Sequence, residues 1–250
     1  MIDGVGNVHS VLVLGGISGI GDVGIAIVDR LVGPRLTRVV LGSLDSPALE
    51  RAVATVRGFG VSDVQTVAFD PVETWSHARL VDTVFDSGDI DVVVLCPGIW
   101  SLESAEDESL DQALAVDVLS ASFVGSASIA LQVVRRMKRQ GHGTLVTVVQ
   151  TVGARHGSND FVVTSAMAGL DAFAVGLAES ASEGGTRVIV CRTALPGYPG
   201  VAAPSAVGAA VASAIRSRRN DIIYVPATLR AVASGMRLFP RRLSRRFRPR

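Results

Sequence analysis

The sequence predicts an α/β fold in which a doubly wound, mainly parallel sheet of seven strands carries helices on both faces. Short runs rich in Val, Ile and Leu alternate with longer helical patterns along the whole chain. This alternation is typical of right-handed βαβ crossovers. The mean hydropathy of +0.40 is high, as expected when strands are covered on both faces and therefore read as continuous apolar runs.

The expected strands are short runs of β-branched residues bounded by Gly, Asp, Ser or Pro. The first of them leads directly into a glycine-rich turn. The intervals between the others leave room for a helix, which a parallel pair of strands requires. We expect strands at residues 10–16, 38–43, 63–69, 89–98, 144–150, 187–192 and 220–226.

The expected helices have apolar residues at spacings of three and four. The longest pattern, residues 110–137, ends before the turn RQGHG, where glycines favour a helix stop. We expect helices at residues 23–32, 46–60, 77–85, 110–137 and 161–181.

Length and composition indicate one domain, residues 1–235, followed by a basic tail, residues 236–250. The first residues lack the basic and apolar segments of a signal peptide. No uninterrupted apolar run reaches the roughly 18 residues of a membrane span. Cys96 and Cys191 lie in strand-like runs far apart in sequence, so we expect two buried, reduced thiols in a cytoplasmic protein.

The tail has a strongly asymmetric charge. The last fourteen residues hold seven arginines and no acidic residue, so the rest of the chain carries a net charge of about −6. One interpretation is an amphipathic segment on anionic lipid at the inner face of the membrane. Another is a solvated segment, or one docked on the acidic body or on a partner subunit. Nucleic acid binding is not expected, because no aromatic stacking platform accompanies the charge. The apolar residues among the arginines are Met236, Leu238, Phe239, Leu243 and Phe247.

The glycine-rich turn GGISGIG suggests a phosphate-binding site. It runs from Gly15 to Gly21, directly before an expected helix. Glycines there let the backbone approach a pyrophosphate, which then lies at the positive end of the helix. Gly19, Gly21 and Gly24 also fit a G-x-G-x-x-G pattern. Asp22 is unfavourable beside a pyrophosphate unless it faces solvent or caps the helix, and a turn kept only for packing is the alternative.

Two segments resemble the short-chain dehydrogenase/reductase family. The turn GGISGIG is similar to the family's glycine turn, and FVVTSAMAGLDAF is similar to its catalytic helix. The resemblance implies a Rossmann fold, an NAD(P) cofactor and oxidoreductase chemistry. MKRQGHG, AGLDAF and the C-terminal pattern are most similar to the actinobacterial decaprenylphosphoryl 2-keto-ribose reductase branch, which reduces a lipid-linked keto sugar for cell-wall arabinan.

The resemblance also implies a set of cofactor contacts. Asp70 follows the third strand, where the family places an acidic residue beside the adenine. After the second strand, GSLDS offers Ser43 or Asp45 for a ribose hydroxyl but no Arg or Lys for a 2′-phosphate, so NAD(H) is favoured over NADP(H). No metal site is expected. The expected cofactor residues are Gly15, Ser18, Gly19, Ile20, Gly21, Ser43, Asp70 and Gly98.

The positions that the family uses for catalysis hold other residues. The family's Tyr position is Val163, its Lys position is Met167 and its Ser position is Gln150. Its Asn position is Asp117 or Ser122, depending on the register of the preceding helix. A side chain that delivers a proton is typically worth about 10²–10⁴ in rate, and neither Val163 nor Met167 can do so.

Other residues could substitute for the missing acid. Tyr198 lies in LPGYPG, near the expected nicotinamide end, and His156 lies near Asp160 before the catalytic helix. The alternative is that the loop containing His156 and Asp160 only caps the helix that follows it. The region expected to contact the substrate also differs from the family. Thr193 and Ala194 stand in place of its Pro-Gly, and the segment at residues 200–213 is several residues shorter than the corresponding segment of the reductase branch.

These observations predict a pseudoenzyme, meaning a non-catalytic homologue or partner of a related reductase. The alternative is an active oxidoreductase on a keto group of a lipid-linked sugar, with acid/base work moved to Tyr198 or His156. By resemblance, the chain forms a homo-oligomer or pairs with a related reductase through the two long helices beside the catalytic positions.

Overall fold

The computed structural model of the chain describes residues 7–16, 19–44, 46–97, 112–152, 161–181, 185–194, 201–217 and 221–231. Seven strands form one sheet in the order β3-β2-β1-β4-β5-β6-β7, and all neighbouring pairs are parallel. This confirms the predicted α/β fold. The strands are β1 Ser10–Gly15, β2 Arg38–Ser43, β3 Asp63–Ala68, β4 Val92–Cys96, β5 Gly143–Val152, β6 Thr186–Ala194 and β7 Ile222–Val225.

The predicted helices are all present, but the structure differs from the prediction in several details. The long helix predicted at residues 110–137 continues to Gln140, where Gly141 adopts a left-handed conformation and donates its N–H to the Met137 carbonyl. It also contains a π-helical turn, η3. Helix α7 was not predicted, because its sequence is mostly small residues with weak periodicity. The helices are α1 Gly21–Leu31, α2 Pro47–Gly58, η1 Thr74–Ser76, α3 His77–Asp86, α4 Gln112–Leu119, η3 Ser120–Gly125, α5 Ser126–Gln140, α6 Phe161–Ala181 and α7 Pro204–Ser217.

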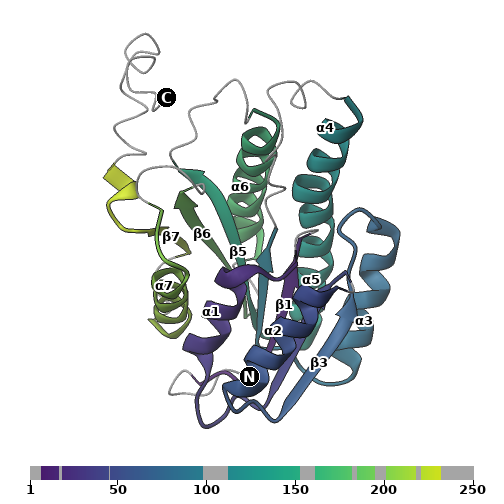
Figure 1. Ribbon diagram of the computed structural model, residues 1–250, viewed down its shortest axis with the longest axis vertical. Coiled ribbons are helices and arrows are strands. Elements are labelled where there is room, and N and C mark those ends of the chain that lie inside the picture. The colour runs from purple at the N-terminus through teal and green to yellow at the C-terminus, as the bar shows by residue number, and fades with distance from the viewer. Residues whose placement is uncertain are drawn as a thin grey trace.

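The sheet lies between two helical layers (Figure 1). Residues of α1, α2 and α7 share one buried apolar cluster with one face of the strands. Residues of α3, α5 and α6 share another with the opposite face. Strand side chains alternate between the faces, so β1 contributes Val11 and Val13 to one cluster and Leu12 and Leu14 to the other. Burial on both faces accounts for the high hydropathy.

The parallel strands bring their carboxyl ends to one edge of the sheet. Gly15, Ser43, Cys96 and Gln150 lie at or near the ends of β1, β2, β4 and β5. The strand order reverses between β1 and β4. In open α/β sheets, ligands bind outside the carboxyl ends at this reversal. The topology therefore places any ligand site at this edge.

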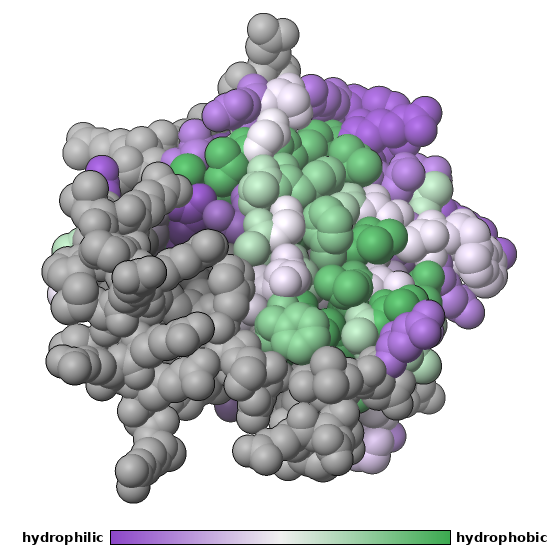
Figure 2. Space-filling view, turned by 90° about the horizontal axis from the view of Figure 1, so that it is seen from above, coloured by the Kyte–Doolittle hydropathy of each residue, from purple (hydrophilic) through white to green (hydrophobic). Residues whose placement is uncertain are grey.

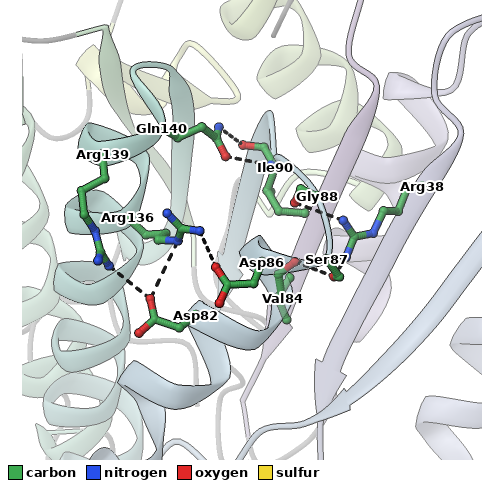
Figure 3. A network of polar contacts seen from close by, with 10 residues as sticks. All are labelled: Arg38, Asp82, Val84, Asp86, Ser87, Gly88, Ile90, Arg136, Arg139 and Gln140. Atoms are coloured by element: carbon green, nitrogen blue, oxygen red, sulfur yellow. Dashed lines mark hydrogen bonds and ion pairs between the residues drawn. The ribbon is translucent and has the colours of Figure 1, made fainter.

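A polar network fixes the opposite edge of the sheet (Figure 3). Arg38 donates to the carbonyls of Val84 and Gly88 at the end of α3, each at 3.1 Å. Arg136 contacts Asp86 at 2.6 Å, and Gln140 exchanges two hydrogen bonds with the backbone of Ile90. These contacts tie α5 to α3 and to the start of β4. They hold the helix that carries η3 in a fixed position.

Two helical stretches, 112–140 and Phe161–Ala181, are long and apolar enough to cross a membrane by length and mean hydropathy. No continuous apolar run in the sequence suggested this. Both stretches have a side that packs into the core clusters. The apolar composition of these helices therefore serves the core at least in part.

Both cysteines are free and buried, as predicted. Burial raises the pKa of the Cys96 and Cys191 thiols to about 12. Because the thiolate is the reactive form, we expect neither to react with Ellman's reagent in the native protein at pH 8. Two thiols should react after unfolding in guanidinium. Rapid labelling of the native protein would contradict this placement.

Candidate functional site

The glycine turn is built in a way that only glycine permits. A Cβ on Gly15 would lie 2.3 Å from the carbonyl oxygen of Gly19. Gly19 and Gly21 have positive φ angles of 96° and 67°, which other residues rarely adopt. Gly19 donates its N–H to the carbonyl of Gly16 at 2.9 Å. The chain thus folds back closely at the carboxyl end of β1.

Helix α1 begins directly after this turn. The residue before it, Ile20, provides no side-chain cap, and a helix start without such a cap can bind an anion. Gly24 lies on the buried side of α1, where a Cβ would be 3.1 Å from the Cγ1 of Val13 in β1. Asp22 is exposed, so its charge faces solvent. Gly15, Gly19 and Gly21 shape the turn, and Gly24 sets the helix–strand distance.

Ser43 lies at the end of β2 beside the glycine turn. Its side chain is 1% exposed, and its Oγ has no hydrogen-bond partner among the described residues. The Oγ lies 3.9 Å from the position of a Cβ on Gly19. An orphaned buried hydroxyl is unusual, and a ribose hydroxyl would satisfy it. The turn, the uncapped helix and Ser43 therefore fit the adenosine half of a dinucleotide.

Asp70 lies just after β3, on the same edge. One carboxylate oxygen accepts a hydrogen bond from the Val72 N–H at 2.8 Å, and the second has no hydrogen bond to the residues that the structure describes. The carbonyl oxygen of Asp70 accepts from the N–H of Glu73 at 3.2 Å and lies 3.1 Å from Nε2 of His77. The position predicted to face an adenine is thus held by its own local turn and by His77.

His77 is fully buried, and this makes stability depend on pH. Burial is the main cause of its lowered pKa, and it outweighs the opposing effect of Asp70. The folded protein therefore binds fewer protons than the unfolded chain as pH falls below the usual histidine pKa of about 6.5. We expect the free energy of unfolding to fall between pH 7 and pH 5, and to fall less in His77→Gln. Urea titrations at both pH values measure this, and identical pH dependence in the two proteins would contradict it.

The catalytic positions lie in an apolar cluster. Val163 and Met167 occupy the buried side of α6 and are 5% and 1% exposed. They share a cluster with Val118 of α4, Val149 of β5 and other apolar residues. Neither Val163 nor Met167 can donate a proton or carry a charge. The spacing of four residues on one helix accounts for the common orientation of Val163 and Met167.

Gln150 follows Val149 near the end of β5. The pairing of β5 with β6 shifts between Gln150 and Val152, and such irregularities re-aim side chains. The Oε1 of Gln150 is buried without a hydrogen-bond partner among the described residues. Of the two candidates for the family's Asn position, Asp117 is exposed, whereas Ser122 is buried in η3.

The sequence analysis did not predict an ion pair that joins α6 to β6. Arg192 of β6 donates to both carboxylate oxygens of Asp171 in α6, at 2.7 and 2.9 Å, and to the Tyr224 hydroxyl in β7 at 2.6 Å. Asp171 raises the pKa of Arg192 despite its burial. The available signal was Arg192, which directly follows the apolar run of residues 188–191 in β6. The pair joins α6 to the outer strands of the sheet.

Several predicted site residues lie outside the described residues, so the structure does not place them. The described residues contain no group of three His, Cys, Asp or Glu side chains suited to a metal. The residues without a described position are Ser18, Asp45, Gly98, His156, Asp160 and Tyr198, together with the whole tail.

The fold and the glycine turn are typical of dinucleotide-binding α/β proteins. The chain matches the short chain dehydrogenase family over residues 9–228, and it belongs to this family of oxidoreductases. It is 39% identical, over 98% of both chains, to an uncharacterized oxidoreductase of Streptomyces coelicolor. It is also 31% identical to an uncharacterized oxidoreductase of Mycobacterium tuberculosis, in a match that covers 83% of this chain and 86% of the other.

Solved structures show the same fold. A metagenomic short-chain oxidoreductase in complex with NADP superposes with a TM-score of 0.73 at 18% identity, over 87% of this chain and 97% of the other. A 3-oxoacyl-[acyl-carrier protein] reductase from Brucella melitensis gives 0.73 at 20% identity, over 88% and 97%. Both comparisons support the Rossmann-like architecture.

Proposed function

We propose that this protein binds a nicotinamide dinucleotide but does not reduce carbonyl groups by its family's usual route, and that it acts as a partner or regulator of a related reductase. The observation that carries the proposal is the burial of Val163 and Met167 in an apolar cluster. The glycine turn, Ser43 and Asp70 support the binding half of the proposal.

The physical reason concerns proton delivery. A bound nicotinamide supplies hydride chemistry, and carbonyl reduction then needs a proton as the alkoxide forms. Val163 has no proton to give, and the thioether of Met167 has no charge with which to lower a neighbour's pKa or bind a ribose. The loss of a positioned acid costs about 10²–10⁴ in rate. The described part of the site can therefore hold a nucleotide without completing the reaction.

Calorimetric titration with NADH and NADPH tests the binding half. We expect heat of binding with NADH, and weaker binding of NADPH because β2 ends in Ser43 with no adjacent Arg or Lys in GSLDS. Gly15→Val is the matched control, since its side chain would collide with the backbone of Gly19. No heat with either cofactor would refute cofactor binding, and tighter NADPH binding would refute the preference.

The second candidate is an active oxidoreductase that reduces a keto group of a lipid-linked sugar in cell-wall arabinan synthesis. It is favoured by the 39% identity to a relative named an oxidoreductase over nearly the whole chain. Tyr198 or His156 would then act as the catalytic acid and base. Tyr198→Phe or His156→Ala should abolish turnover, and turnover that survives both substitutions would remove this candidate.

Assembly through the long helices is the partner arrangement we propose. Val116, Val124 and Leu131 are about half exposed on α4, η3 and α5. Figure 2 shows an apolar surface at the upper end of the molecule, beside the atoms drawn in grey. On α6, Ala168, Ala172 and other exposed residues are small, which permits close helix packing. Light scattering should give a dimer or larger species, and Ala172→Arg should shift it towards monomer.

The tail is the proposed contact with anionic lipid at the cytoplasmic face of the membrane. Its seven arginines in fourteen residues interleave with apolar side chains. Deletion of residues 241–250 should abolish sedimentation with phosphatidylglycerol vesicles, with phosphatidylcholine vesicles as the control. Equal sedimentation of the full and shortened chains would refute this contact.

A further inference from the structure

We call the segment from Phe69 to His77 the adenine-edge segment. It is held in place by contacts with η3 and α5. His77 is fully buried. Its Nε2 lies 3.1 Å from the carbonyl oxygen of Asp70, and its Nδ1 lies 3.0 Å from the Oγ of Ser128 in α5. A carbonyl oxygen can only accept, so Nε2 carries the proton. In the neutral ring, Nδ1 then accepts from the Ser128 hydroxyl.

The π-helical turn η3, which continues directly into α5, makes a second contact with the segment. Gly125 lies so close to the segment that a Cβ would be 1.9 Å from the carbonyl oxygen of Pro71. The ring of Phe69 packs against His77 with centroids 5.3 Å apart. The backbone on either side of the Asp70 carbonyl is therefore fixed by contacts from α3 and from the helix that carries η3.

We propose that His77 is a positioning residue for nucleotide recognition, which holds the Asp70 carboxylate ready to accept a hydrogen bond from the amino group of an adenine. The proposal rests on the dinucleotide binding proposed above and adds a residue outside the glycine turn. One carboxylate oxygen of Asp70 accepts from the Val72 N–H, and the other has no hydrogen bond to any described residue. Fixing the acceptor before binding lowers the entropic cost of the contact.

The chemistry distinguishes adenine from hypoxanthine. Adenine carries an exocyclic amino group, which donates to a carboxylate, whereas hypoxanthine carries a carbonyl oxygen at that position, which a carboxylate repels. A hydrogen bond to a charged group is strong enough that we expect AMP to bind at least about tenfold more tightly than IMP. This ratio reports on the placement of Asp70 and not on overall stability.

The experiment is a titration of the full chain and its variants with AMP and IMP. His77→Leu removes both ring contacts and should bring the ratio close to one, as should Asp70→Asn. His77→Gln can still reach the Asp70 carbonyl with its amide N–H and should keep most of the preference. Ser128→Ala removes only the contact on the far side of the ring, so it should lower the ratio less than His77→Leu does.

The outcomes separate the two proposals. If the wild-type chain binds neither AMP nor NADH, the proposed function fails, and the positioning role fails with it. If the wild-type chain prefers AMP and a folded His77→Leu protein keeps that preference, only the role of His77 is overturned. Should His77→Leu not fold, His77→Asn, whose amide is too short to reach the Asp70 carbonyl, takes its place, and a wild-type ratio in that variant overturns the proposal.

Discussion

Replacing Gly125 with alanine is expected to lower the free energy of unfolding by about 3 kcal/mol, at the upper end of the usual cost of overpacking. The added methyl group would lie 1.9 Å from the carbonyl oxygen of Pro71 and 2.7 Å from its carbon. Both are backbone atoms of a segment that His77 also holds, so neither can move aside cheaply. Urea denaturation followed by circular dichroism measures the loss.

Gly176 provides the matched control. It lies within α6 and has no atom within 4 Å of the position of a Cβ. Alanine is a better helix former than glycine by about 1 kcal/mol, so Gly176→Ala should raise stability slightly. If Gly125→Ala is as stable as Gly176→Ala, the close approach of η3 to the adenine-edge segment is wrong.

Replacing Met167 with lysine, the residue of the family's catalytic helix, should destabilise the protein by about 3–5 kcal/mol, the usual cost of an uncompensated buried charge. Met167 is 1% exposed, and its cluster consists of apolar side chains. Burial would lower the pKa of the new ammonium group. The folded variant therefore favours the neutral amine, and part of the lost stability should return as pH rises towards the ordinary lysine pKa of about 10.4.

Met167→Leu is the control for this substitution, and it should cost less than about 1.5 kcal/mol because volume and polarity are nearly conserved. Denaturation curves at pH 7 and pH 9.5 compare the two variants. A lysine variant as stable as the leucine variant at pH 7 would mean that this position opens to water or to a polar partner. It would then resemble a working catalytic site.

The main architecture could be predicted from the sequence because burial on both faces leaves a strong pattern. The runs at residues 38–43 and 161–181 coincide with β2 and α6 to the residue. The helix expected at residues 46–60 is α2, Pro47–Gly58, and the structure shows that Ser46 caps it and Pro47 opens it. Helix α7 was not predicted because Ala and Ser are its most frequent residues, and small residues give little contrast between its faces.

The local register of the site was harder to predict. The two candidates for the Asn position, Asp117 and Ser122, were open because a π-helical turn lies in the helix that carries them. A π turn changes the number of residues per turn without a clear sequence signature. The contact between Arg192 and Asp171 joins residues 21 positions apart, and His77 meets Ser128 across 51 positions. Such pairs depend on tertiary packing, which one sequence does not display.

The most direct test of inertness is the absorbance of NADH at 340 nm over time, with the pure protein and a panel of ketones, keto sugars and 3-oxoacyl thioesters. We predict that wild type oxidises NADH no faster than Gly15→Val, whose glycine turn is blocked. Cofactor-dependent turnover at ordinary enzyme rates, about 1–10³ per second, in wild type but not in Gly15→Val would contradict the account.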